Sequence, residues 1–189
     1  MIHILKKIGQ FILDTVQAIV LALSIFIIIY LFLFQPHQVK GSSMHPNFEN
    51  GEFLLTNKIS YRFEKPKRGE IIVFKAPPSE PCAEIECEYI KRVIGVPGDR
   101  VMVSDGKVYV NGQLLNETYL SKDLVTGSGS FLSEGVEKVI PDGYYLPMGD
   151  NRPYSSDSRV FGAFSLEDVI AKDTYVFYPL HEINWFKGK

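Results

Sequence analysis

The chain has 189 residues, of which 46% are hydrophobic, and its formal net charge at pH 7 is −2. This length suffices for one core of roughly 100–200 residues plus a short extra element. The charge balance, without any run of Lys or Arg, excludes the basic footprint of a nucleic-acid-binding protein, so we expect no nucleic-acid partner.

An apolar run covers residues 18–34, AIVLALSIFIIIYLFLF, in which Ser24 is the only small polar residue. With the seven residues before it, the stretch exceeds the roughly 20 residues that a helix needs to cross a bilayer. We therefore predict a transmembrane anchor over residues 11–35, in contact with the lipid bilayer. A cleaved signal peptide would have a shorter apolar core and a small-x-small site after it, and a buried helix would carry a polar face.

The charges beside this run predict its orientation. Lys6 and Lys7 precede it, so the positive-inside rule places residues 1–10 in the cytoplasm. Residues 36–189 then form an extracytoplasmic domain on the outer face of the cell membrane.

Short apolar runs separated by Gly, Pro and Asp follow residue 36 and predict a β domain. The motifs SDGK and VNGQ supply the Asp-Gly and Asn-Gly pairs typical of two-residue hairpins. The predicted fold class is mainly β, with a single transmembrane helix followed by an all-β catalytic domain of the sandwich or barrel kind. Residues 117–139 are polar and rich in Gly and Ser, and we interpret them as a long surface excursion. The predicted strands cover 52–58, 70–76, 88–96, 100–104, 107–115, 143–150 and 173–178.

The cysteines and histidines indicate no metal centre. Cys82 and Cys87 lie in one short loop, where an extracytoplasmic location permits a disulfide, although the sequence does not decide whether they are joined. The histidines lack the spacing of metal-ligating motifs, so we expect no metal and no cofactor. These scattered histidines are His3, His37, His45 and His181.

The stretch VKGSSMHPNF, residues 39–48, places two serines just beyond the anchor. A serine is a nucleophile only when a base takes its proton, and the usual base is histidine. His45 and the other histidines are poorly placed for this. Lys91 lies instead in an apolar strand, EYIKRVIGV, although most strand lysines point to water. A lysine with an ordinary pKa is neutral in only about one molecule in 2,500 at pH 7, so this base would have to be buried.

Three motifs then carry a resemblance to a known family. GSSMHP, YIKRVIGVPGD and GDNRPYSSDSRVFG resemble, in this order behind an N-terminal anchor, the boxes of the bacterial type I signal peptidases, or leader peptidases. The resemblance extends from the anchor to about Phe177. It implies a membrane-anchored serine endopeptidase with a Ser-Lys dyad, whose substrates are the signal peptides of exported preproteins.

The resemblance also assigns roles. It implies that Ser43, directly before Met, is the nucleophile and that Lys91, directly before Arg, is the general base. Ser155 would hydrogen-bond the Lys91 amine. Further supporting positions are Asp150, Arg152, Asp157 and Arg159.

The resemblance places four residues around the pockets for small side chains at the first and third positions before the cut. Ordinary core packing is an equally open interpretation of each. They are Val39, Met44, Phe48 and Tyr89.

One position departs from the family pattern. Some members have a serine two residues before the nucleophile that donates its hydroxyl to the oxyanion, and this chain has Gly41 there. The second oxyanion donor therefore stays open, with Ser42 as one candidate.

Two alternatives also stay open. A non-catalytic anchored β domain that binds a partner outside the cell would not need Ser43 or Lys91. A processing peptidase for a narrow client, such as a pilus or conjugation subunit, would need both residues.

Overall fold

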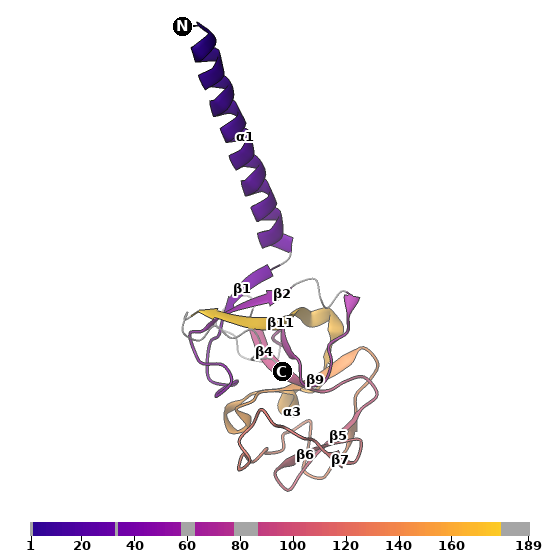
Figure 1. Ribbon diagram of the computed structural model, residues 1–189. Coiled ribbons are helices and arrows are strands. Elements are labelled where there is room, and N and C mark those ends of the chain that lie inside the picture. The colour runs from indigo at the N-terminus through magenta and orange to yellow at the C-terminus, as the bar shows by residue number, and fades with distance from the viewer. Residues whose placement is uncertain (1, 33, 58–62, 78–86, 179–189) are drawn as a thin grey trace.

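A long N-terminal helix stands away from a β-rich body in the computed structural model (Figure 1), which describes residues 2–32, 34–57, 63–77 and 87–178. The helix, α1, spans Ile2–Phe32. Its segment Lys6–Tyr30 has 25 residues and a mean hydropathy of 2.5, and none of its most apolar window is buried. At 1.5 Å per residue this segment is roughly 37 Å long, more than the ~30 Å of a bilayer's hydrocarbon core.

The helix boundaries differ from the range 11–35 predicted for the anchor. The helix begins at Ile2 and ends at Phe32, and strand β1 (Phe34–Gln38) follows it directly. Pro36 favours this early end, because the residue before a proline disfavours helical backbone. A proline also suits β1, which is an edge strand of its sheet.

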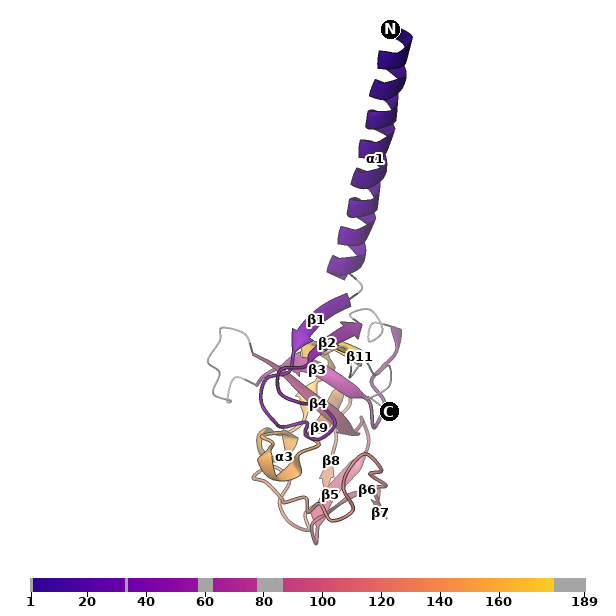
Figure 2. The same ribbon diagram turned by 60° about the vertical axis from the view of Figure 1, so that its left-hand side comes forward.

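The body contains two antiparallel sheets. The larger has the order β1-β2-β11-β3-β4-β9-β10, and the smaller, β7-β6-β5-β8, lies at the end of the body far from α1 (Figures 1 and 2). The predicted mainly β fold class is confirmed. The remaining strands are β2 (Phe53–Asn57), β3 (Ile71–Lys75), β4 (Glu88–Gly95), β5 (Arg100–Ser104), β6 (Lys107–Val110), β7 (Gln113–Leu114), β8 (Lys138–Val139), β9 (Tyr144–Met148), β10 (Phe164–Ser165) and β11 (Val169–Tyr178).

Both predicted hairpins are present in the smaller sheet. Asp105 and Gly106 have φ of 51° and 73°, and they join β5 to β6. Asn111 and Gly112, with φ of 55° and 76°, join β6 to β7. Positive φ at both central residues gives the type I′ turn, whose twist matches that of the strands.

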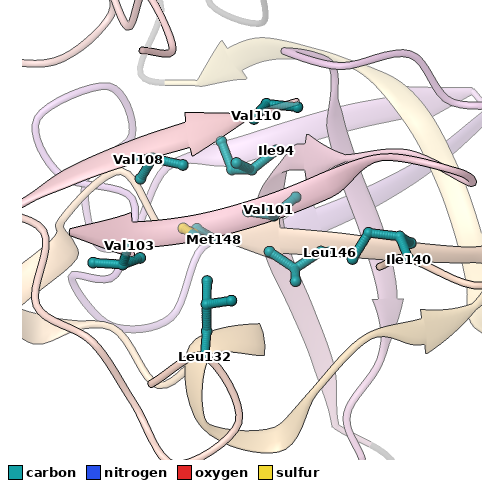
Figure 3. Close-up of a cluster of buried hydrophobic side chains, with 9 residues drawn as sticks. All are labelled: Ile94, Val101, Val103, Val108, Val110, Leu132, Ile140, Leu146 and Met148. Atoms are coloured by element: carbon teal, nitrogen blue, oxygen red, sulfur yellow. The ribbon is translucent and has the colours of Figure 1, made fainter. Parts of the chain in front are cut away.

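An apolar core connects the two sheets (Figure 3). Val101 and Val103 of β5 face Leu146 and Met148 of β9, and all four side chains are buried. Three short helical segments follow β9: η1 (Arg152–Tyr154), α3 (Ser158–Phe161) and η2 (Leu166–Asp168). The last of these, η2, lies within the sequence SLEDV, residues 165–169.

Residues 117–139 are mostly exposed, as predicted for a surface excursion, but the segment is also anchored by buried side chains. Thr126 and Leu132 are buried at 2% and 0% exposure. A Cβ placed on Gly129 would lie 2.2 Å from the carbonyl oxygen of Arg159, so the segment packs directly against α3. Glu117 and Thr126 bond to the buried Arg152, and the Gly127 carbonyl accepts from Arg159, contacts that a sequence pattern does not distinguish from exposure to water.

Candidate active site

The serine predicted as nucleophile lies in the turn that connects β1 to β2. Backbone hydrogen bonds between Val39 and the residues Gly51 and Glu52 close this turn. Asn151, which follows β9, makes two hydrogen bonds to this turn. Its backbone N–H donates to the Ser43 carbonyl and its side-chain amide donates to the Ser42 carbonyl, both at 2.9 Å. The peptide units on either side of Ser43 are therefore held from one neighbouring segment.

The predicted base lies beside this serine. Lys91 Nζ is 2.7 Å from Ser43 Oγ, although the two residues are 48 positions apart in the chain. Lys91 is only 3% exposed, because it occupies the middle of β4 between β3 and β9. Its Nζ also lies 3.2 Å from the Ile90 carbonyl oxygen and 4.9 Å from the centre of the Tyr89 ring.

The pair opens into a cleft of about 720 Å³. One wall comes from β1 and the turn after it, and the other comes from the first half of β4. An extended peptide fits such a cleft, and β1 as an edge strand can accept one beside it. The lining residues include Pro36, His37, Val39, Gly41, Ser43, Glu88, Tyr89, Ile90, Lys91 and Tyr154.

The histidines of the described segments do not contact the serine hydroxyl. His45 is half-exposed and its Nδ1 lies 2.9 Å from Glu49 Oε1. His37 Nδ1 lies 2.6 Å from Glu88 Oε2. His3 belongs to α1, and His181 falls outside the described residues. Within the described part of the chain, the geometry thus favours Lys91 over histidine as the group that could take a proton from Ser43.

Ser155 lies near Ser43 but makes no hydrogen bond to Ser43 or Lys91. Its hydroxyl oxygen is buried and has no hydrogen-bond partner in the structure, so the expected bond to Lys91 is not formed. A Cβ on Gly149 would lie 2.2 Å from Ser155 Oγ and 2.5 Å from the Ser43 carbonyl oxygen. Glycine is required at position 149 because these two groups approach its backbone so closely.

A buried ion pair lies close to the β1–β2 turn that carries Ser43. Arg92 and Asp150, both 0% exposed, are joined by two hydrogen bonds of 2.9 and 2.7 Å. Asn47 of the turn donates to the same carboxylate at 2.8 Å. The Arg92 guanidinium also packs on the Tyr119 ring, 3.9 Å from its centre, and burial raises the pKa of that phenol. Asp150 thus links β4 to the turn, and its two partners Arg92 and Asn47 both contact Tyr119 of the segment 117–139.

A second pair, Asp157 with Arg159, stabilises the segment that follows. Asp157 caps α3 by accepting from the Arg159 backbone N–H and receives two bonds of 2.8 Å from the Arg159 guanidinium. It also accepts from the Gly149 N–H at 3.0 Å. Arg159 in turn donates to the Arg152 and Ser155 carbonyls at 2.7 and 3.2 Å. These contacts hold Ser155 in place.

Arg152 anchors the segment 117–139. Its guanidinium pairs with Glu117 and donates to Thr126 Oγ1 at 2.8 Å. Burial by itself would lower the pKa of Arg152, but the Glu117 carboxylate raises it above its ordinary value. Arg152 is therefore a permanent structural cation.

The four predicted pocket residues divide into two pairs. Val39 and Tyr89 line the cleft. Met44 and Phe48 are 1% and 0% exposed. They belong to an apolar cluster that also contains Val39. They contact other core residues and are absent from the cleft lining.

Several site residues escaped the sequence analysis. Arg92 lies in the second motif, directly after Lys91, and Asn151 lies in the third motif. The resemblance assigned no role to either residue. Glu117 and the His37–Glu88 pair carry no local signal, because their partners are distant in sequence. Among the described residues, no cluster of three His, Cys, Asp or Glu side chains could hold a metal ion.

Cys87 lines the cleft at the start of β4 and is disulfide-bonded. The chain's other cysteine, Cys82, lies outside the described residues.

The chain is similar to known proteins over most of its length. Residues 12–178 match the family model described as "Signal peptidase, peptidase S26". The chain is 33% identical to signal peptidase IB of Staphylococcus aureus (strain MRSA252), over 92% of this chain and 93% of the relative. It is 36% identical to signal peptidase I P of Bacillus subtilis subsp. natto, over 93% of this chain and 94% of the relative. The chain also matches a crystal structure of a signal peptidase I from Enterococcus faecalis V583, with 31% sequence identity and a TM-score of 0.46. The match covers 58% of this chain and 97% of the crystallised chain.

Proposed function

Because the chain belongs to the signal peptidase family, peptidase S26, and is a signal peptidase protease, we propose that it cleaves preproteins by a Ser-Lys mechanism with Ser43 as nucleophile and Lys91 as general base. Its substrates are preproteins that carry signal peptides. The observation that carries the proposal is the 2.7 Å approach of Lys91 Nζ to Ser43 Oγ at the wall of a peptide-sized cleft.

Burial is what suits Lys91 to this role. At 3% exposure the ammonium form loses most of its hydration, and this favours the neutral amine. A neutral amine has a lone pair for the Ser43 proton, whereas an ammonium has none. The contact with the Tyr89 ring opposes this effect only in part, because a cation–π interaction is much weaker than the hydration that burial removes.

The reaction then proceeds in two steps. Ser43 Oγ bonds to the scissile carbonyl carbon as its proton passes to Lys91 Nζ, and the resulting ammonium returns a proton to the leaving amine. The scissile C–N bond breaks, the amine product leaves, and Lys91 is again neutral. A water molecule then attacks the acyl-enzyme carbonyl carbon as its proton passes to Lys91 Nζ. Collapse of the second intermediate returns the proton to Ser43 Oγ and releases the cleaved signal peptide.

The charge on the carbonyl oxygen needs hydrogen-bond donors. The Ser43 backbone N–H makes no hydrogen bond in the described part of the chain, so it can serve as one donor. The Gly41 N–H already donates to Asn50 Oδ1 at 2.8 Å. The neighbouring candidate for the second donor is therefore the exposed hydroxyl of Ser42.

The supporting residues act through position. Asp150, Asp157 and Arg159 hold the segment beside Ser43 and Lys91, and none of them contacts the Ser43 hydroxyl. Ser155 offers an enclosed, unpartnered hydroxyl. We propose that this hydroxyl becomes a hydrogen-bond partner of the Lys91 amine when substrate fills the cleft.

The same proposal includes a membrane location. α1 crosses the bilayer with its lysine-bearing N-terminal end in the cytoplasm, and the β body lies on the outer face. Ser43 is eleven residues beyond Phe32, so even a fully extended connection spans only roughly 36–40 Å. The nucleophile is thus held near the bilayer surface, where the cleavage site of a membrane-inserted signal peptide emerges.

The test is cleavage of a model preprotein by the full chain in detergent or liposomes. Ser43→Ala and Lys91→Met should each abolish processing, while Ser42→Ala retains part of it. Lys91→Met preserves the apolar stem, so circular dichroism should show an unchanged fold. Wild-type activity should rise with pH as the amine loses its proton. A folded Lys91→Met variant that cleaves near the wild-type rate would exclude the Ser-Lys mechanism.

A further inference from the structure

An exposed tyrosine lines the catalytic cleft. Tyr154 is 77% exposed, yet it belongs to the lining of the cleft that contains Ser43 and Lys91. Single exposed apolar side chains are common on protein surfaces, so exposure alone assigns no role to this ring. Its position in the same cleft as the catalytic pair is what points to a role in the reaction.

The backbone on both sides of Tyr154 is held in place. Its N–H donates to the Asn151 carbonyl at 3.0 Å, within the short helix η1. Arg159 Nη2 donates to the carbonyls of Arg152 and Ser155, at 2.7 and 3.2 Å. The tyrosine ring therefore projects from a fixed segment, and contact with a ligand requires little ordering of the backbone.

The helix η1 leads from the nucleophile toward the end of the body that is remote from α1. Asn151, directly before η1, bonds to the carbonyls of Ser42 and Ser43. The chain continues through η1 to α3, which begins at Ser158. In both views α3 lies farther from α1 than β1 does (Figures 1 and 2). Tyr154 thus lies beyond Ser43 for a chain that comes from the α1 side.

A preprotein would come from that side. With α1 in the membrane, the apolar part of a signal peptide occupies the α1 side of the cleft, and the residues after the cut leave Ser43 in the opposite direction. Tyr154 is three residues from Asn151, a rise of about 6 Å in a 3-10 helix. An extended substrate covers this distance in two residues, at about 3.3 Å each. The ring therefore lies beside the first three residues after the cut.

We infer that Tyr154 is a specificity-determining residue for the mature part of the preprotein, where it favours an aromatic side chain at one of the first three positions after the cut. This inference rests on the proposed function. Contacts between two aromatic rings should raise kcat/KM by about two- to ten-fold. The contact exists in the bound substrate as well as in the transition state, so the gain should appear mainly in KM. Added salt should not remove it, because the contact involves no pair of charges.

The experiment uses the full chain in detergent and peptides from one preprotein that are identical up to the cut. The peptides carry phenylalanine or serine at each of the first four positions after it. Wild type should prefer phenylalanine at one of the first three positions. Tyr154→Ala should remove this preference, and Tyr154→Phe, which keeps the ring, should retain it.

The chain offers a matched control. Tyr144, on β9, is 41% exposed and lies outside the cleft lining, so Tyr144→Ala should leave the preference unchanged. The inference would be overturned by a wild type without a preference at the first three positions, by a preference that survives in Tyr154→Ala, or by a Tyr154→Ala variant that slows all peptides equally. No cleavage by wild type, or cleavage that persists in Ser43→Ala, would instead overturn the proposed function.

Discussion

Asn151 should control the rate of cleavage through the orientation of one peptide unit. Its side-chain amide donates to the Ser42 carbonyl at 2.9 Å. In a planar trans peptide the carbonyl and the N–H that follows it point in opposite directions. By holding the Ser42 carbonyl, Asn151 therefore directs the Ser43 N–H away from itself, and this N–H is the proposed donor to the oxyanion.

The magnitude follows from what each substitution removes. Asn151→Ala deletes one neutral hydrogen bond, worth about 0.5–1.5 kcal/mol, and leaves the backbone bond to the Ser43 carbonyl in place. If that free energy orients the N–H, kcat should fall about two- to twelve-fold. Asn151→Asp should be slower still, because it replaces the donor by an oxygen that repels the Ser42 carbonyl. Complete loss of an oxyanion donor, about 10²–10³-fold, sets the upper limit.

The assay separates orientation from general damage. A peptide aldehyde forms a tetrahedral adduct whose oxygen occupies the oxyanion position, so its Ki should rise in parallel with the fall in kcat/KM while substrate KM stays nearly constant. Asn116→Ala, at an exposed asparagine outside the cleft, is the control. Unchanged kcat and Ki in Asn151→Asp would refute the reasoning, as would an effect confined to KM.

Three further outcomes follow from the structure, each measured on the full chain in detergent. Asp150→Ala leaves Arg92 buried without its carboxylate and should lower the free energy of unfolding by about 3–5 kcal/mol in urea titrations; a loss below 1 kcal/mol would contradict this. Burial alone would raise the pKa of Asp99, but the hydrogen bonds that its carboxylate accepts lower this pKa below the ordinary value. The ionised carboxylate therefore stabilises the folded protein above about pH 4, and this contribution is lost as the pH falls further. Asp99→Asn should therefore lower the thermal midpoint at pH 7 but much less at pH 3, and an equal shift at both pH values would argue against an ionised Asp99. The double variant Cys82→Ser, Cys87→Ser should keep kcat, since the proposed reaction uses neither cysteine, and a double variant that is folded but inactive would contradict this.

The local features of the fold were predictable because they depend on neighbouring residues. The turn pairs Asp105–Gly106 and Asn111–Gly112 set both hairpins through their backbone preferences. The apolar runs located the long strands for the same reason. β1 was missed because its sequence, FQPHQ, is polar and contains a proline. What makes it a strand is pairing with β2, a contact across the nucleophile turn.

The candidate site divides in the same way. Motif resemblance located Ser43 and Lys91, and the structure brings them within hydrogen-bond distance. That Lys91 is buried did not follow from its strand, because the alternation of EYIKRVIGV fits an exposed lysine equally well. The Arg92–Asp150 pair joins residues 58 positions apart, and no periodicity signals such a pair. Pairing of distant charges is decided by the whole fold.

The cations of the site differ in chemistry according to their task. Arg92, Arg152 and Arg159 are at most 5% exposed, and each donates both to a carboxylate and to a backbone carbonyl. A guanidinium keeps its charge under all physiological conditions and presents several donors in a fixed plane, so it suits permanent scaffolding. Such a group cannot accept a proton from Ser43. The amine of Lys91, which can lose its charge when buried, is the one cation beside the nucleophile hydroxyl in the described structure that is able to do so.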